Sequence, residues 1–195
     1  MENKHEIINY FISKIGYTTY LELGIGSKKE TFSEIKCSYK TGVDSTVGGE
    51  DIINVTTDEF FKMNKKKYDV IYIDADHDVE SVYKDYLNAA KYLKKGGIIF
   101  MHDIGPVSLR NTSPAASGTA YKAWIRICAK DTTGLAFSYE FPNTDILGII
   151  IPSIKSENII INSDETWDNY ENNKKDILNI KTLSEIDKII NDIKK

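Results

Sequence analysis

Tyr68-Asp-Val-Ile-Tyr-Ile-Asp-Ala-Asp-His77 is the stretch that decides the fold of this chain. Val70–Ile73 is a short run of β-branched and aromatic residues, which is typical of a strand buried on both faces of a sheet. The run ends in Asp74, Asp76 and His77, three titratable residues in close succession. In an open α/β sheet, ligands bind beyond the carboxyl ends of the strands. The stretch therefore predicts a central strand whose end carries the chemistry of the protein.

The periodicity of the remaining chain predicts strands and helices that alternate around this strand. Amphipathic spacing and capping signals predict helices over residues 3–15, 29–35, 58–63 (capped by Thr57), 79–93, 119–129 and 182–195. Apolar runs predict further strands over residues 18–23, 40–43, 52–55, 98–101, 136–141 and 146–151. The alternation up to residue 103 predicts an α/β fold with a doubly wound, mostly parallel sheet. The short joint at residues 142–145 predicts a hairpin, so the last two strands are expected to run antiparallel.

Glycine and proline mark two connecting segments. Lys94-Lys95-Gly96-Gly97 is expected to close the helix over residues 79–93, with cations near its negative end and glycine beyond it. Residues 104–118 hold two prolines, two glycines and several small polar residues, and they are expected to form a long loop. Loops of this length in compact domains are usually functional or mobile.

The length of 195 residues fits one domain with a full core, and we place this domain at residues 1–152. Residues 153–195 differ in composition and are interpreted as a C-terminal extension that packs on the same domain. Residues 158–162 are expected to form one more strand, and residues 163–180 are rich in Asp, Asn, Glu and Lys. The final helix carries its apolar side chains on one face, namely Leu183, Ile186, Ile189, Ile190 and Ile193.

Composition limits the partners that the protein can have. The net charge of -4 and the pI near 5.5 give no general attraction to nucleic acids or acidic membranes. Cys37 and Cys128 are too few for a disulfide scaffold and are expected to be reduced thiols. The first residues lack the apolar core of a signal peptide, and no apolar run approaches the ~20 residues of a membrane span. We therefore expect a cytoplasmic protein without a nucleic-acid or membrane partner.

A glycine turn and an acidic residue predict a nucleoside site. Glu22-Leu-Gly24-Ile-Gly26 joins the first predicted strand to the next helix, and glycine lets backbone approach a ligand closely. Asp44 lies at the predicted end of the second strand, where a carboxylate can accept hydrogen bonds from ribose hydroxyls. An ordinary turn and a solvated strand-end aspartate are the alternatives, but their pairing favours the nucleoside interpretation. A dinucleotide site is disfavoured, because Lys29 occupies the third glycine position of that motif.

Four motifs in order resemble the class I S-adenosylmethionine-dependent methyltransferases, namely Tyr20-Leu-Glu-Leu-Gly-Ile-Gly26, Gly42-Val-Asp44, the stretch over residues 68–77 and Leu93-Lys-Lys-Gly-Gly-Ile-Ile-Phe-Met-His-Asp103. The resemblance covers about residues 15–151 and is strongest to the small-molecule O-methyltransferase branch. It implies a Rossmann-like sheet of seven strands with an antiparallel last strand. It also implies roles in cofactor binding. Glu22, Gly24 and Gly26 would line the methionine end, Asp44 with Ser45 the ribose, Thr57 and Asp58 the adenine, and Asp74 the reactive end.

Acidic residues and histidines gather at two strand ends that are predicted to be neighbours. Catechol-type and caffeoyl-CoA-type O-methyltransferases, which the chain resembles, hold a divalent metal at this place, so Asp74, His102 and Asp103 are candidate metal ligands. The resemblance departs here, because His102-Asp103 stands where those enzymes carry Asp-Asn. Carboxylates suit Mg²⁺, while an imidazole shifts the preference toward Mn²⁺, Fe²⁺ or Zn²⁺. Two other interpretations stay open: His77 or His102 acts as a general base without metal, or these residues only bind loop backbone.

The predicted activity is S-adenosylmethionine-dependent transfer of a methyl group to a small-molecule acceptor, with or without a divalent metal. A hydroxyl acceptor is favoured because it must lose a proton, and Asp74, His77 and His102 are placed to assist. Residues 104–118 with Tyr121, Trp124 and Arg126 are candidates for the acceptor pocket, although core packing is the better interpretation of Trp124. The alternatives are a nicotinamide-dependent oxidoreductase and a non-catalytic nucleotide-binding or interaction protein. The acceptor and the oligomeric state, including a homo-oligomer, are not readable from the sequence.

Overall fold

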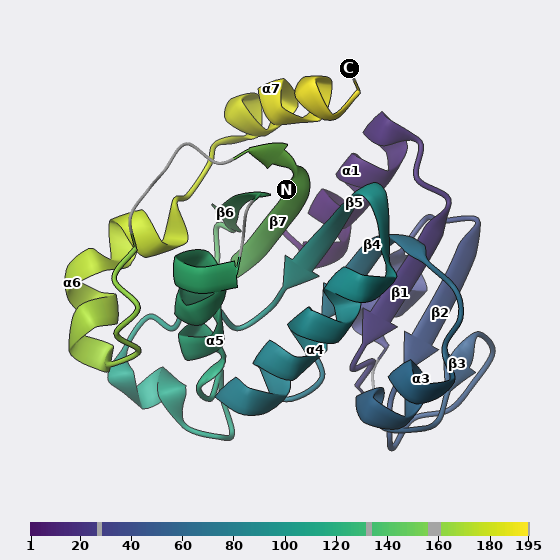
Figure 1. Cartoon of the computed structure of the whole chain (residues 1–195), viewed down its shortest axis with the longest axis horizontal. Helices are drawn as coiled ribbons and strands as arrows, with labels where there is room; N and C mark the ends of the chain where they lie inside the picture. The colour runs from purple at the N-terminus through teal and green to yellow at the C-terminus, as the bar shows by residue number, and fades with distance from the viewer. Residues whose placement is uncertain (27–28, 132–133, 156–160, 195) are drawn as a thin grey trace.

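The computed structural model of the chain describes residues 1–26, 29–131, 134–155 and 161–194. Its centre is a seven-stranded sheet with the order β3-β2-β1-β4-β5-β7-β6 (Figure 1). Strands β1 to β5 run parallel, whereas β7 runs antiparallel to both of its neighbours, β5 and β6. The strands are β1 (Thr19–Leu23), β2 (Tyr39–Val43), β3 (Ile52–Ile53), β4 (Tyr68–Ile73), β5 (Leu93–Met101), β6 (Gly134–Glu140) and β7 (Ile146–Lys155).

Helices cover both faces of this sheet. The helices of the described residues are α1 (Lys4–Ile15), α2 (Glu30–Glu34), α3 (Thr57–Met63), α4 (Val79–Tyr92), α5 (Ala120–Arg126), α6 (Trp167–Leu178) and α7 (Leu183–Ile193). A 3-10 turn, η1 (Leu109–Thr112), lies within the long loop after β5, and a π-helical turn, η2 (Ile127–Asp131), continues α5. The predicted fold class, a Rossmann-like and mostly parallel sheet with an antiparallel last strand, is confirmed.

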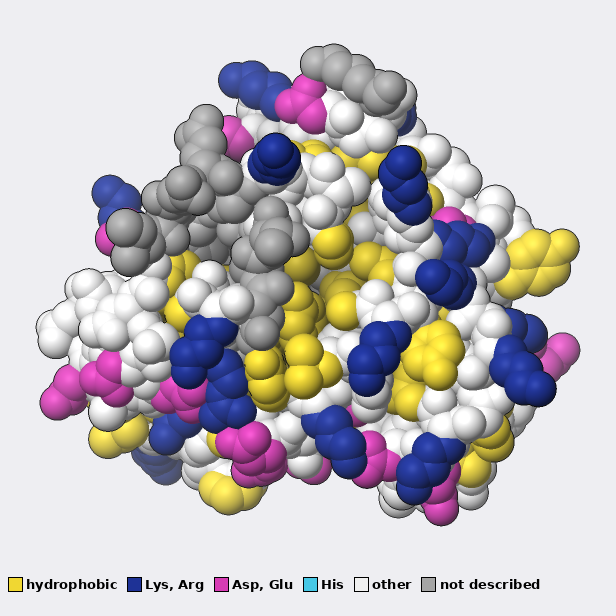
Figure 2. All heavy atoms as spheres, in the orientation of Figure 1, with side chains coloured by type: hydrophobic (Ala, Val, Ile, Leu, Met, Phe, Trp, Pro, Cys, Tyr) yellow, Lys and Arg dark blue, Asp and Glu magenta, His cyan; other side chains and the backbone are white. Residues whose placement is uncertain are grey.

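The face of the molecule in Figure 2 mixes charges of both signs. Lys and Arg side chains lie beside Asp and Glu side chains and surround apolar side chains near the middle of the view. No histidine side chain is visible on this face. In the same orientation β1 and β2 point toward the lower edge, so their carboxyl ends lie there (Figure 1). The functional residues predicted at these strand ends therefore belong to the lower edge of the view.

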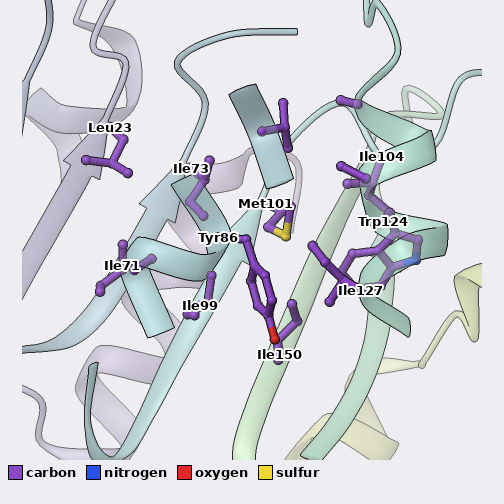
Figure 3. Packing of buried hydrophobic residues seen from close by; sticks show 14 of the residues in the cluster. Leu23, Ile71, Ile73, Tyr86, Ile99, Met101, Ile104, Trp124, Ile127 and Ile150 are labelled. Carbon is purple, nitrogen blue, oxygen red and sulfur yellow. The ribbon is translucent and has the colours of Figure 1, made fainter. Parts of the chain in front are cut away.

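The central strand β4 is buried on both sides, as its sequence predicts. Ile71 and Ile73 pack into one apolar cluster, whereas Val70 and Tyr72 pack into a second one on the opposite face. This alternation follows from the two-residue period of side chains along a strand. In the first cluster, Tyr86 of α4 lies over β5 and β7 beside α5 (Figure 3). The second cluster receives apolar side chains of α1, α2 and α7.

The C-terminal residues share these two clusters. Ile186 and Ile190 of α7 are buried in the second cluster, and Tyr170 and Leu178 of α6 are buried in the first. The final helix forms where the sequence predicts it, and the side chain of Thr182 caps it in a capping box with Glu185. Helix α6 was not predicted, because its polar sequence and a kink at residue 173 obscure the helical period. Most of the strand expected over residues 158–162 lies outside the described residues.

Several predicted boundaries were wrong, three of them at the ends of helices. Thr56, not Thr57, caps α3, because its side chain accepts the backbone N–H of Glu59 while the Glu59 side chain returns to the Thr56 N–H. Strand β5 begins directly at Leu93, so Lys94–Gly97 lies in the strand instead of capping a helix. Gly97 permits this, because a Cβ there would lie 2.7 Å from the carbonyl oxygen of Asp69. Helix α5 is shorter than predicted, since η2 follows it from residue 127.

Within the part of the chain that the structure describes, none of the helices combines the length and the apolar character that crossing a membrane requires.

Burial of α7 leads to a prediction for stability. Ile186→Ala removes a fully buried side chain and is expected to lower the free energy of unfolding by about 2–5 kcal/mol. Leu183→Ala, at a side chain that is 36% exposed on the same helix, is the control and should cost clearly less. Urea unfolding followed by circular dichroism measures both changes. Equal and small losses would show that α7 does not pack as described.

Candidate active site

The register of the parallel strands brings four strand ends to one edge of the sheet. Leu23 at the end of β1 pairs with Val43 of β2 on one side and with Ile73 of β4 on the other, and Ile73 pairs with Met101 of β5. The residues that directly follow these strands therefore lie along the same edge of the sheet. They include predicted site residues.

The glycine turn after β1 packs against the end of β4. Gly24 has a φ of 84°, and a Cβ built on it would lie 2.2 Å from the carbonyl oxygen of Asp74. No side chain fits at that distance, so only glycine allows this approach. Gly26 also has a positive φ, of 65°, but open space surrounds its Cβ position. The turn is thus tight at Gly24 and open at Gly26.

Asp44 connects the glycine turn to the loop after β2. Its Oδ2 accepts hydrogen bonds from the N–H groups of Ile25 (2.9 Å) and Gly26 (3.1 Å). Its Oδ1 accepts the N–H and hydroxyl of Thr46 and the N–H of Val47. Burial opposes ionisation, but these hydrogen bonds outweigh it and lower the pKa of Asp44 to about 2. The carboxylate is therefore ionised at neutral pH, and ribose hydroxyls would have to share or displace its present partners.

A cavity of about 350 Å³ opens beside this turn. Its lining brings together predicted cofactor residues from the turn after β1, the loop after β2 and the start of α3, namely Gly24, Asp44, Ser45, Thr57 and Asp58.

Asp85 of α4 also lines this cavity, and sequence reasoning did not find it. It is 3% exposed, and burial raises its pKa to about 6. The sequence did hold one signal for Asp85, because this acidic residue lies on the apolar side of an amphipathic helix.

A second cavity of about 260 Å³ lies beside Gly26 and is lined by Glu22, Gly26, Asp74 and Lys4, among others. Glu22 is 1% exposed, and the hydroxyl of Tyr20 donates to its carboxylate. Burial raises the pKa of Glu22 to about 8, against the opposing effect of this hydrogen bond. Of the four cofactor residues predicted for the methionine end and the reactive end, Glu22, Gly26 and Asp74 line this cavity, whereas Gly24 lines the first one.

A cluster of histidines and carboxylates adjoins the second cavity. His102 Nδ1 lies 3.0 Å from Oδ1 of Asp74 and 3.1 Å from Oδ2 of Asp103, and its Nε2 lies 3.1 Å from Asp145. Ligand atoms of Asp74, His102 and Asp103 lie within 4.8 Å of one another, a spacing that can hold a metal ion. Asp103 adopts a positive φ of 58°, which is uncommon for a residue other than glycine and is typical of functional sites.

The charge state of His102 follows from this environment. Burial opposes the imidazolium, but the nearby charge of Asp74 and hydrogen bonds to Asp103, Asp145 and Asp74 raise its pKa well above the ordinary value. Both ring nitrogens then donate, so His102 has no lone pair for a proton or a metal in this arrangement. His77 is more accessible, since its side chain is 36% exposed while its Nε2 lies 3.1 Å from Oδ2 of Asp103.

Two residues of this cluster escaped sequence reasoning. Asp145 ends the turn of the β6–β7 hairpin, and the pairing of Met101 with Gly148 brings this turn next to the end of β5. The predicted hairpin could have pointed to it. Lys4 comes from α1, at the far end of the sequence, and its Nζ lies 3.2 Å from Nε2 of His102 and 3.8 Å from Oδ2 of Asp74. No local pattern signals this contact, which depends on how α1 docks.

The aromatic and basic candidates for the acceptor pocket lie elsewhere. Trp124 is fully buried and donates its indole N–H to the carbonyl of Ile177, as core packing predicts, and Tyr121 is buried against α6. Arg126 forms ion pairs with Glu80 and Glu165, at 3.0 Å and 2.7 Å. These three residues therefore join α4, α5 and the segment before α6.

The loop over residues 104–118 does reach the site. Gly118, with a φ of 56°, packs directly on His77, because a Cβ there would lie 2.4 Å from the His77 carbonyl oxygen. Thr119 donates its N–H to the same oxygen. Val107 and Leu109 of this loop are 52% and 60% exposed. Two exposed apolar side chains therefore belong to the loop whose last residue, Gly118, packs on His77.

Comparison with known proteins agrees with this geometry. Residues 16–104 match the model of a family described as a methyltransferase domain. This part of the chain is therefore similar to methyltransferase domains. The predicted recognition of a class I, S-adenosylmethionine-dependent methyltransferase is confirmed at the level of the enzyme class. No curated protein sequence matches the chain.

Solved structures share the fold of this chain. The O-methyltransferase from Bacillus cereus, in complex with SAH, is 13% identical with a TM-score of 0.53, over 76% of this chain and 80% of that one. TomG from Streptomyces achromogenes, an O-methyltransferase of tomaymycin synthesis in complex with SAM, is 9% identical with a TM-score of 0.56, over 78% and 80%. The mycinamycin-pathway methyltransferase MycE, in complex with Mg and SAH, is 10% identical with a TM-score of 0.54, over 80% and 50%. At these identities the likeness shows the fold alone.

The buried state of Glu22 predicts a pH dependence of stability. Because its folded pKa is raised to about 8, the folded protein keeps a proton that the unfolded chain releases near its ordinary, lower pKa. The contribution of Glu22 to stability is therefore present at low pH and lost as the pH rises toward about 8. Relative to Glu22→Gln, the wild type should lose free energy of unfolding as the pH rises from about 5 to 8.

Urea unfolding at several pH values measures this difference. Glu34→Gln, at an exposed glutamate of α2, is the control and should keep a constant offset from the wild type. Parallel pH profiles for the wild type and Glu22→Gln would contradict the assignment.

Proposed function

We propose that this protein transfers the methyl group of S-adenosylmethionine to a hydroxyl of a small-molecule acceptor. The observation that carries the proposal is the juxtaposition of the two cavities at the glycine turn, with the His102 cluster beside the second one. The adenosyl group fits the first cavity, with its ribose toward Asp44 and its adenine toward Thr57 and Asp58. The amino-acid end then enters the second cavity toward Glu22. This arrangement leaves the sulfonium near Asp74.

Methyl transfer requires mainly the correct placement of two groups, because the sulfonium already activates the methyl carbon. The acceptor oxygen attacks this carbon in line with the departing sulfur, and its proton must leave to a nearby group. His77 and Asp74 are the proposed proton acceptors at the reacting oxygen, with Asp103 orienting His77 through a 3.1 Å contact. His102 lies beside them and would accept a proton only after it has released its own. The titratable groups of the cluster favour a hydroxyl acceptor, because a carbon or amine acceptor depends less on a base that removes its proton.

The donor set of the cluster also fits a divalent metal. Asp74 and Asp103 supply carboxylate oxygens and His102 an imidazole nitrogen, a combination that suits Mg²⁺ or Mn²⁺. A bound ion would lower the pKa of the acceptor hydroxyl. His102 would first have to release a proton, because its present hydrogen bonds occupy both ring nitrogens. MycE, which has the same fold, was solved with Mg and SAH and supports this part of the proposal.

Cofactor binding is the first test. S-adenosylhomocysteine is expected to raise the melting temperature of the wild type, and Asp44→Ala should weaken its binding about tenfold or more, because charge-assisted hydrogen bonds to the ribose are lost. Asp44 also holds the glycine turn, so calorimetric titration should be run at a temperature where both proteins are folded. Glu50→Ala, at an exposed residue of the same loop, is the matched control. NADH serves as the competing ligand of an oxidoreductase.

Absence of any shift with millimolar S-adenosylhomocysteine would count against the proposed function. Binding of NADH with tighter affinity would favour the oxidoreductase instead.

Metal binding is tested separately. Mn²⁺ titrated into the wild type should lose its free-ion electron paramagnetic resonance signal, and Asp103→Asn should weaken binding by about tenfold or more, because one ligand is lost. Asp76→Asn removes a nearby carboxylate that instead accepts the N–H groups of His77 and Asp78, and it should bind Mn²⁺ like the wild type. Equal affinities for the two variants would remove the metal site from the proposal.

A further inference from the structure

Lys4 brings a positive charge from the N-terminal helix into the second cavity. Its Nζ lies 3.2 Å from Nε2 of His102 and 3.8 Å from Oδ2 of Asp74, and its side chain is 26% exposed. The same cavity is lined by Glu22 and Gly26. The ammonium group therefore lies beside the cluster and can still be reached from the cavity.

The position of Lys4 in its helix is electrostatically unfavourable. Lys4 is the first residue of α1, where the partial positive charge of the helix N-terminus disfavours a cation. The helix is fixed there because Ile7, Ile8 and Phe11 are fully buried against the sheet. Interaction with the carboxylates at the strand ends offsets this cost. A lysine held against the helix dipole at a cofactor cavity indicates a ligand-binding role.

The other lysine that lines this cavity is committed elsewhere. Lys29 donates from its Nζ to the carbonyl of Gly48, at 3.1 Å, and so ties the start of α2 to the loop after β2. The described lining thus offers the carboxyl group of Glu22, whose ionised form an incoming ammonium would favour, and the ammonium of Lys4. The amino-acid end of S-adenosylmethionine carries the matching pair, an ammonium and a carboxylate.

We propose that Lys4 binds the carboxylate of the cofactor's amino-acid end, opposite the Glu22 that binds its ammonium. The inference rests on the proposed function, since it names a further residue of the same cofactor site. In this arrangement Lys4 exchanges its contacts with His102 and Asp74 for the incoming carboxylate. Binding of the cofactor then draws the ammonium away from the residues that face the acceptor.

Two ligands separate this contact from the rest of the site. S-adenosylhomocysteine carries the amino-acid end, whereas 5′-methylthioadenosine keeps the adenosyl group and sulfur but lacks the ammonium and carboxylate. Lys4→Met is expected to weaken S-adenosylhomocysteine by about tenfold or more, as loss of a charged hydrogen bond implies, and to leave 5′-methylthioadenosine unchanged. Lys4→Arg keeps the charge and should retain most of the affinity. Lys14→Met, at the other end of α1, is the control and should bind both ligands like the wild type.

Calorimetric titration of the four proteins gives the affinities, and circular dichroism confirms that each is folded. Wild-type affinities for both ligands in Lys4→Met would overturn the role of Lys4 while leaving the proposed function intact. An equal loss for both ligands would also overturn it, because the lysine would then support the site as a whole. Failure of the wild type to bind either ligand would instead refute the proposed function, and this inference with it.

Discussion

The contact of Gly24 with the backbone of Asp74 is the constraint on which the site depends. A Cβ at Gly24 would lie 2.2 Å from the Asp74 carbonyl oxygen, so the turn after β1 and the end of β4 meet only through glycine. This approach places the turn between two cavities, one beside Asp44 and one beside Glu22. A ligand that spans both must pass over this turn. The sheet supplies the constraint, because β1 and β4 pair in parallel up to Leu23 and Ile73.

Electrostatics determines what the two cavities can accept. In the first, Asp44 is ionised but already bonded to the loops around it, so a ribose must compete with backbone N–H groups. In the second, Glu22 holds its proton through burial, and an incoming ammonium would favour its ionised form. Beside both, the charge of His102 is balanced by three carboxylates. The site therefore changes its charge distribution when a cationic ligand arrives.

Local sequence predicted the sheet and the strand ends well, because burial on both faces and glycine turns leave strong signals. Residues 68–77 alone located β4 and the cluster at its end. The contributions of Lys4 and Asp145 depend on how α1 and the β6–β7 hairpin dock, which no local pattern records. Helix α6 was missed because its buried Tyr170 and Leu178 are dispersed in a polar segment. The acceptor-pocket roles predicted for Tyr121 and Arg126 find no support in their contacts, because Tyr121 packs against α6 and Arg126 forms ion pairs with Glu80 and Glu165.

In the proposed arrangement, one adenosyl ligand spans the glycine turn with its sulfur facing Asp74. A crystal structure of the protein with S-adenosylhomocysteine tests this claim most directly. We expect electron density for the adenosyl group between Gly24 and Asp44, continuing past Gly26 to Glu22. Density in a different cavity, such as the one beside Tyr39 and Lys67 at the opposite strand ends, would contradict it.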